Sequence, residues 1–167
     1  GEVDSSSLRA SFLWTPTDAL RVLWKTDYND IDLGGYPADP ALATNDPFEI
    51  ALNGPNRAHD RFVRSSLNVS YAFDNGVTLR SITGYQDGVS LFSTDLDGTT
   101  LQNNTFADRF EETVWSQEFN LLSPDDQRFT WLVGLYYQYD DARFPVTSFP
   151  YGEYLIGFPE GVLDISL

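Results

Sequence analysis

The sequence predicts an all-β fold, an antiparallel up-and-down meander of about six strands. Apolar and polar residues alternate in six separate runs, with the two-residue period of a strand whose faces differ in environment. Tight-turn sequences and long polar connections alternate between these runs. We find no segment with the three-to-four-residue apolar period of a helix.

Each run places its apolar side chains on one face of a strand. The fourth run has an ambiguous facing, because Leu79 and Ile82 fall on opposite sides. In chain order the runs cover Ser5–Thr15, Leu20–Tyr28, Phe62–Phe73, Val77–Tyr85, Ser116–Leu122 and Phe129–Tyr139. For the fourth run, an end at Tyr85 and a continuation to Phe92 both stay open.

The connections alternate between short and long. Short turns are predicted at Pro16-Thr17-Asp18, at Asp74-Asn75-Gly76, where Asn-Gly favours a hairpin, and at residues 123–128. Long irregular loops are predicted at about residues 30–60 and 93–111. After Phe144, the proline, glycine and aromatic content argues against a further strand.

This alternation is typical of transmembrane β-barrels of the bacterial outer membrane, which have short turns at one end and long loops at the other. A ten-residue strand rising ~3.3 Å per residue and tilted by ~45° covers about 23 Å, close to the ~25 Å apolar band of such barrels. The polar faces are too polar for the inside of a sandwich. We therefore expect the meander to be part of an outer-membrane β-barrel, with its apolar face toward lipid.

Two sets of residues follow from this interpretation. The residues expected to face lipid are Phe12, Trp14, Val22, Trp24, Leu67, Val69, Tyr71, Phe119, Leu121, Trp131, Val133 and Leu135. Those expected to face the lumen are Arg9, Arg21, Lys25, Arg64, Asn68 and Glu118. The basic members of the second set either line a hydrated lumen or pair with carboxylates of a plug. Aromatic residues at the run ends suit the two interfacial girdles.

Composition excludes several classes of function. The 167 residues carry a net charge of −15, so a nucleic-acid partner is not expected. Cysteine is absent, which excludes disulfides and thiolate metal sites. No apolar stretch reaches the ~18 residues of a membrane helix. Neither a signal-peptide pattern at the first residues nor a closing turn at the last is present, and we expect the chain to be cut at both ends, by natural truncation or as an excerpt.

Three stretches resemble the barrel portion of TonB-dependent outer-membrane receptors. They are SITGYQDG, STDLDGTT and FEETVWSQEFNLLSPDDQRFTWLVGLYYQ. The resemblance is strongest from about Arg61 to Tyr139 and weaker over residues 8–30. The resemblance implies a 22-stranded barrel closed by a plug, which imports a scarce nutrient such as a siderophore, vitamin or oligosaccharide. Residues 1–167 then form a partial barrel without the plug or the segment that contacts TonB.

The same resemblance implies the partners and the location. The chain is expected in the outer membrane of a Gram-negative bacterium, in contact with lipid, the remaining strands and the plug. The TonB energy-coupling complex is reached only through the full protein. No catalytic role, cofactor or metal is expected.

Three motifs contain residues that could bind a metal ion or act as catalytic groups. Asp95-Leu96-Asp97-Gly98 begins like a calcium loop, but the twelfth position is Phe106, so a solvated loop is expected. Glu111 and Glu112 are adjacent and would point to opposite faces of a strand, which argues against a glycosidase pair. His59 is the only histidine, and we expect it to be solvated in a loop.

The alternative is a soluble, secreted β-sandwich that binds carbohydrate through loop aromatics. Candidates for such contacts, or for a receptor vestibule, are Tyr36, Phe48 and Tyr151. A sandwich predicts that a second sheet buries the apolar face, whereas a barrel predicts one continuous curved sheet with that face convex. The residues that distinguish them are Leu8, Phe12, Trp24, Leu67, Trp131 and Leu135.

Overall fold

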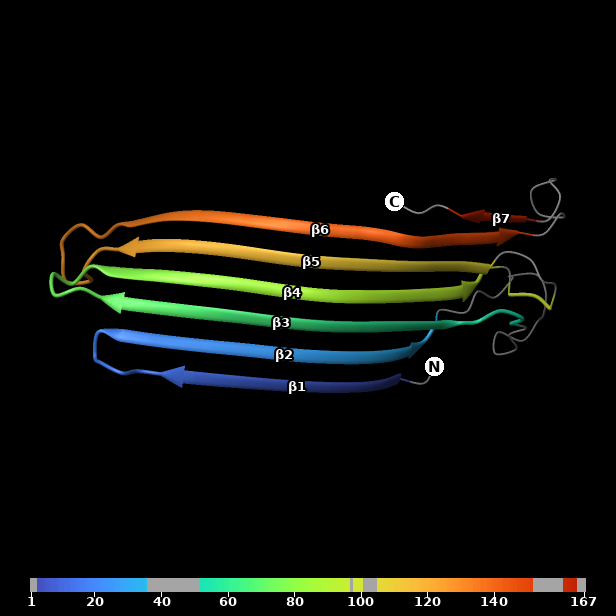
Figure 1. The fold of residues 1–167 in the computed structure, drawn as a ribbon, viewed down its shortest axis with the longest axis horizontal. Helices are drawn as coiled ribbons and strands as arrows, with labels where there is room; N and C mark the ends of the chain where they lie inside the picture. Colours follow the sequence, from blue (N-terminus) through green and yellow to red (C-terminus); the bar gives the residue numbers. More distant parts are fainter. Residues whose placement is uncertain (1–2, 36–51, 97, 101–104, 152–160, 165–167) are drawn as a thin grey trace.

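A computed structural model describes residues 3–35, 52–96, 98–100, 105–151 and 161–164. These residues form one antiparallel sheet whose strands follow chain order, each hydrogen-bonded to its neighbours in sequence (Figure 1). The predicted all-β, up-and-down meander is confirmed. A search of the described residues finds no helix that is long and apolar enough to cross a membrane.

Six long strands make up the sheet, and a short seventh strand adds to the end of the sixth. The seventh strand was not predicted. The strands are β1 (Val3–Trp14), β2 (Leu20–Gly34), β3 (Arg57–Ala72), β4 (Thr78–Asp95), β5 (Thr105–Leu122), β6 (Leu132–Tyr151) and β7 (Gly161–Asp164).

The three short turns lie together at one end of the sheet, as predicted (Figure 1, left). In the β3–β4 turn, Phe73 N–H donates to the Val77 carbonyl at 2.8 Å and Gly76 N–H to the Phe73 carbonyl at 2.9 Å. Gly76 has a φ of 81°, which only glycine adopts at little cost. In the β5–β6 turn, Ser123 and Trp131 exchange two hydrogen bonds of 2.9 Å.

The strands are longer than the sequence predicts. β2 continues to Gly34 and β3 begins at Arg57, so much of the predicted 30–60 loop is strand. Similarly, β4 and β5 extend into the predicted 93–111 loop, and β6 continues to Tyr151 past the proline and aromatic residues. Each of these extensions pairs with a neighbouring strand, and such pairing overrides local propensity.

The sheet is a single layer without a second layer among the described residues. Their only buried hydrophobic residue is Ala58, at 8% exposure. The register between β5 and β6 shifts between Arg109 and Glu111, which marks a β-bulge in the half of the sheet away from the tight turns, called the outer half below. The sheet is therefore held by backbone pairing and cross-strand contacts, with both faces available to their surroundings.

We predict that Gly76→Ala lowers the free energy of unfolding by about 1–2 kcal/mol, because an L residue is disfavoured at positive φ. A Cβ at this position would also meet Pro124 at 3.0 Å. Gly76→Asn adds the same Cβ but tolerates positive φ better, so it should cost less. Urea unfolding in lipid vesicles measures both variants, and equal costs would contradict the conformational explanation.

We further predict that the 167-residue chain expressed alone aggregates in water. In the described structure, β1 pairs with β2 on one side and has no partner on the other. β6 pairs with β5 on one side and, on the other, pairs with β7 only over residues 148–151. The sheet therefore has two open edges, along β1 and along most of β6. Such edges recruit other chains. Size-exclusion chromatography with and without detergent tests this. A monodisperse monomer in plain buffer with a cooperative thermal transition would contradict it.

Candidate functional site

The sheet has two chemically different faces, which the strand register defines. Phe12, Trp24 and Leu67 are directly opposite one another on β1, β2 and β3 and share one face. We call the face that carries these three residues the apolar face. The side chains that alternate with these along each strand, such as Ser11 on β1 and Lys25 on β2, lie on the other face, which we call the polar face.

The register places the two predicted sets of residues on opposite faces. Eleven of the twelve residues expected to face lipid lie within strands, and all eleven are on the apolar face. The twelfth, Trp131, precedes β6, and its N–H is bonded to Ser123 Oγ. The six residues expected to face a lumen, Arg9, Arg21, Lys25, Arg64, Asn68 and Glu118, are all on the polar face. Lipid and lumen themselves remain predictions.

The apolar face is exposed across the sheet. Phe12 is 59% exposed on β1, Phe119 is 48% exposed on β5, and Leu135 is 76% exposed on β6. These side chains are large, and no second layer of the described residues packs over them. Among the described residues the face is therefore an exposed apolar surface of the kind that marks an interaction site.

Aromatic side chains mark one border of the apolar face. Tyr85, Trp115 and Tyr139 are directly opposite one another on β4, β5 and β6. The Trp115 ring also contacts the Tyr137 ring at 5.8 Å between centroids. The next position on the same face of β4 is Asp87, so the face changes from apolar to charged immediately beyond the aromatic border.

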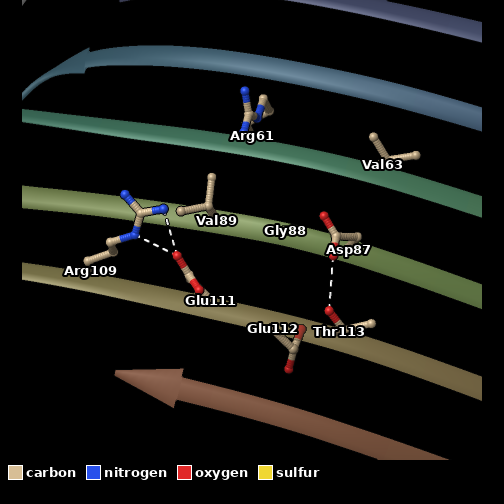
Figure 2. A pocket seen from close by; sticks show the side chains of 9 residues that line it. All are labelled: Arg61, Val63, Asp87, Gly88, Val89, Arg109, Glu111, Glu112 and Thr113. Carbon is tan, nitrogen blue, oxygen red and sulfur yellow. Dashed lines mark hydrogen bonds and ion pairs between the residues drawn. The ribbon is translucent and has the colours of Figure 1, made fainter. Parts of the chain in front are cut away.

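A hollow of about 250 Å³ lies beyond this border, over β3, β4 and β5 (Figure 2). Arg109 forms an ion pair with Glu111 at 2.6 Å, and Thr113 Oγ1 donates to Asp87 at 2.9 Å. Arg61 on β3 also lines the hollow (Figure 2). Because the Arg109–Glu111 pair is well exposed, it contributes little to stability.

The hollow does not bring two carboxylates to a common substrate position. Glu111 is bonded to Arg109 beside it, whereas Glu112 accepts a 2.7 Å hydrogen bond from Gln86 Nε2. Glycoside hydrolysis needs two carboxyl groups that flank one bond. The two side chains are instead engaged separately, as expected for neighbours on a strand.

The polar face carries a chain of hydrogen bonds across three strands. Arg64 Nε on β3 donates to Gln86 Oε1 on β4 at 2.9 Å, and Gln86 continues to Glu112 on β5. Arg9 lies 4.0 Å from Asp27, also on this face. A second hollow, of about 350 Å³, is lined by Arg9, Ser11, Lys25, Asp27, Arg64, Ser65 and Ser66. The face suits a hydrated environment.

Two loop predictions are wrong. His59 is in β3, where it contacts Asp30 and Asp32 of β2, so it is not a solvated loop residue. Asp95 is fully buried at the end of β4, and its carboxylate accepts backbone N–H bonds from Asn53 at 3.1 Å and Gly98 at 3.2 Å. The Asp95 carboxylate therefore has a structural role, because it links the backbone at Asn53 and Gly98 to the end of β4.

The sequence does not predict the grouping of Asp30, Asp32 and His59, because all three fall in the loop predicted at about residues 30–60. The Asp-x-Asp spacing is the available signal, since residues two apart share a face once the segment is a strand. Tyr36, Phe48 and Asp97 lie outside the described residues. So does the side chain of Tyr151, at the end of β6.

Comparisons with known proteins give no family assignment. No family model matches the chain, and no solved structure matches it. The functional inference therefore depends on the chemistry of the two faces and on the residues that resemble receptor barrels.

Proposed function

We propose that this chain is a wall segment of a transmembrane β-barrel in the outer membrane of a Gram-negative bacterium. The barrel belongs to a receptor of the TonB-dependent class, which imports a scarce nutrient. One observation carries the proposal: a single-layer sheet has one uncovered apolar face and one hydrogen-bonded polar face.

The uncovered face is the strongest support. Soluble monomers rarely expose a contiguous apolar patch larger than a few hundred Å². Here the exposed apolar side chains run across all six long strands, from Phe12 on β1 to Leu135 on β6. Lipid supplies such a face with an apolar environment, without any further protein layer.

The height of the apolar face also fits a membrane. On β3 the apolar positions run from Val63 to Tyr71, and the Phe73 ring packs on Tyr71 at 5.0 Å between centroids. The ten residue-to-residue steps from Val63 to Phe73, which directly follows β3, span about 33 Å, or about 23 Å when tilted by ~45°. This agrees with the ~25 Å apolar band of outer-membrane barrels.

The strand ends support the proposed orientation. The six long strands have 12 to 20 residues, more than the ~10 that cross a bilayer, so each is longer than a single membrane crossing. On β2 and β3 the charged residues Asp30, Asp32 and Arg61 lie in the half of the strand away from the tight turns. In outer-membrane barrels the long connections are extracellular and the short turns periplasmic.

The transport role rests on the resemblance to receptor barrels, which is strongest from about Arg61 to Tyr139. In that class the nutrient is a siderophore, vitamin or oligosaccharide. The partners are outer-membrane lipid, the remaining strands and a plug, with the TonB complex engaged by the full protein. The polar face would line the interior, and its arginines, such as Arg9 and Arg64, are available to plug or ligand carboxylates. A net charge of −15 disfavours nucleic acid.

A secreted carbohydrate-binding sandwich is the second candidate. It requires a second sheet over Leu8, Phe12 and Trp24, which are 71%, 59% and 40% exposed in the described structure. The described residues form one sheet, which favours the barrel.

We predict that arginine on the apolar face destabilises the protein according to depth. Leu67 lies near the middle of the band, so Leu67→Arg should cost ~2–4 kcal/mol in lipid vesicles. Val133 is paired with Leu121, in the position next to the turn end, so Val133→Arg should cost only ~0–1 kcal/mol. Urea unfolding of the protein as its gene encodes it, reconstituted in vesicles, measures both costs.

Asn68→Arg is the matched control, because Asn68 follows Leu67 in the same strand but lies on the polar face. It should change the unfolding free energy by less than about 0.5 kcal/mol. Equal costs at positions 67 and 68, or no cost at position 67, would sink the proposal that the apolar face contacts lipid.

A further inference from the structure

Three metal-binding side chains meet on the outer half of β2 and β3. The candidate ligand atoms of Asp30, Asp32 and His59 all lie within 4.8 Å of one another. His59 Nδ1 is 3.0 Å from Asp32 Oδ1 and 3.8 Å from Asp30 Oδ1. The side chain of His59 is 22% exposed and that of Asp30 is 31% exposed, so two of the three ligands are partly shielded from water.

The backbone brings these residues together. Asp30 and Asp32 are two residues apart in β2 and point to the same face. Asp32 is directly opposite His59 in the β2–β3 register, which places the imidazole beside both carboxylates. The convergence therefore depends on paired strands and is independent of any long connection.

Electrostatics favours a cation between these groups. An imidazole Nδ1 carries at most one proton and can donate it along one direction, and here Asp32 is the closer acceptor. Asp30 is left beside a second carboxylate, and like charges at this separation repel. A divalent ion would neutralise both carboxylates and replace the single proton on Nδ1.

A neighbouring side chain orients one of the ligands. Tyr28 OH donates to Asp30 Oδ2 at 2.7 Å, which leaves Oδ1 directed toward His59. Ligating carboxylates in metal sites are commonly held in this way by a second hydrogen bond. Arg61, opposite Asp30 in the register, is the nearest cationic residue on this face by strand pairing.

We propose that Asp30, Asp32 and His59 bind a divalent first-row transition-metal ion, with Zn²⁺ as the reference ion. Two carboxylate oxygens and one imidazole nitrogen are ligands that Zn²⁺ takes at ~2.0–2.2 Å, and three protein ligands leave a position for water. Tetrahedral ligands at these lengths lie about 3.4 Å apart, close to the 3.0 and 3.8 Å separations present. Ca²⁺ and Mg²⁺ prefer oxygen ligands, so the imidazole selects against them.

The bound ion would join β2 to β3 beyond the apolar band. Because its ligands come from both strands, binding stabilises their pairing in that region. The site requires only these two strands and does not depend on the transport role or on a lipid environment.

Zinc binding by the protein as its gene encodes it, purified in detergent and stripped of metal, tests the proposal. Equilibrium dialysis against Zn²⁺, with metal analysis of the protein, gives the number of ions bound. The His59→Ala and Asp32→Asn variants should each bind one Zn²⁺ fewer per chain at a concentration that saturates the natural protein. Asp32→Asn keeps the side-chain shape, so it controls for misfolding in His59→Ala.

Asp87→Asn is the matched control, because Asp87 is an exposed carboxylate on the same face that accepts a hydrogen bond from Thr113 and, among the described residues, belongs to no group that could hold a metal ion. It should bind as much Zn²⁺ as the natural protein, and a tenfold excess of Mg²⁺ should not displace the ion. With Co²⁺ in place of Zn²⁺, the visible absorption should be lost on His59→Ala. Unchanged zinc content in both ligand variants, or equal loss in Asp87→Asn, would overturn the proposal.

Discussion

The uncovered apolar face is the constraint on which the rest of the structure depends. A sheet normally buries its apolar side chains against a second layer, but the described residues provide one layer, and Ala58 is their only buried hydrophobic residue. The driving force for order must then come from backbone pairing within the sheet and from whatever medium contacts Phe12, Trp24 and Leu67. Closed barrels in lipid satisfy both requirements, because each strand is paired on two sides and lipid covers the outer surface.

Alternation in sequence predicted the half of the sheet near the tight turns. Where apolar and polar residues alternate, as from Phe62 to Phe73, the two-residue period alone predicts the strand and its two faces. The turn at residues 74–76 was predictable because Asn-Gly has few other uses. Facing in β4 was ambiguous from the sequence, and pairing resolves it: Leu79 shares a face with Tyr71, whereas Ile82 is opposite Asn68.

The outer half of the sheet could not be predicted in this way. Residues 57–61 and 105–112 have charged side chains on both faces, as expected of strands with water on both sides, and such segments read as loops. Their strand structure comes from pairing with neighbours, a non-local effect. The cluster of Asp30, Asp32 and His59 was hidden for the same reason, since it exists only when β2 and β3 are in register.

Tryptophan fluorescence tests most directly whether the apolar face contacts lipid. Trp14, Trp24 and Trp115 lie on this face by register, and Trp24 is opposite Leu67, near the middle of the band. The measurement is the difference in emission between the natural protein and Trp24→Phe, in vesicles with bromine-labelled acyl chains or with aqueous acrylamide. Lipid contact predicts that bromine quenches the Trp24 emission and that acrylamide does not. Quenching by acrylamide alone would contradict the assignment of the apolar face to lipid.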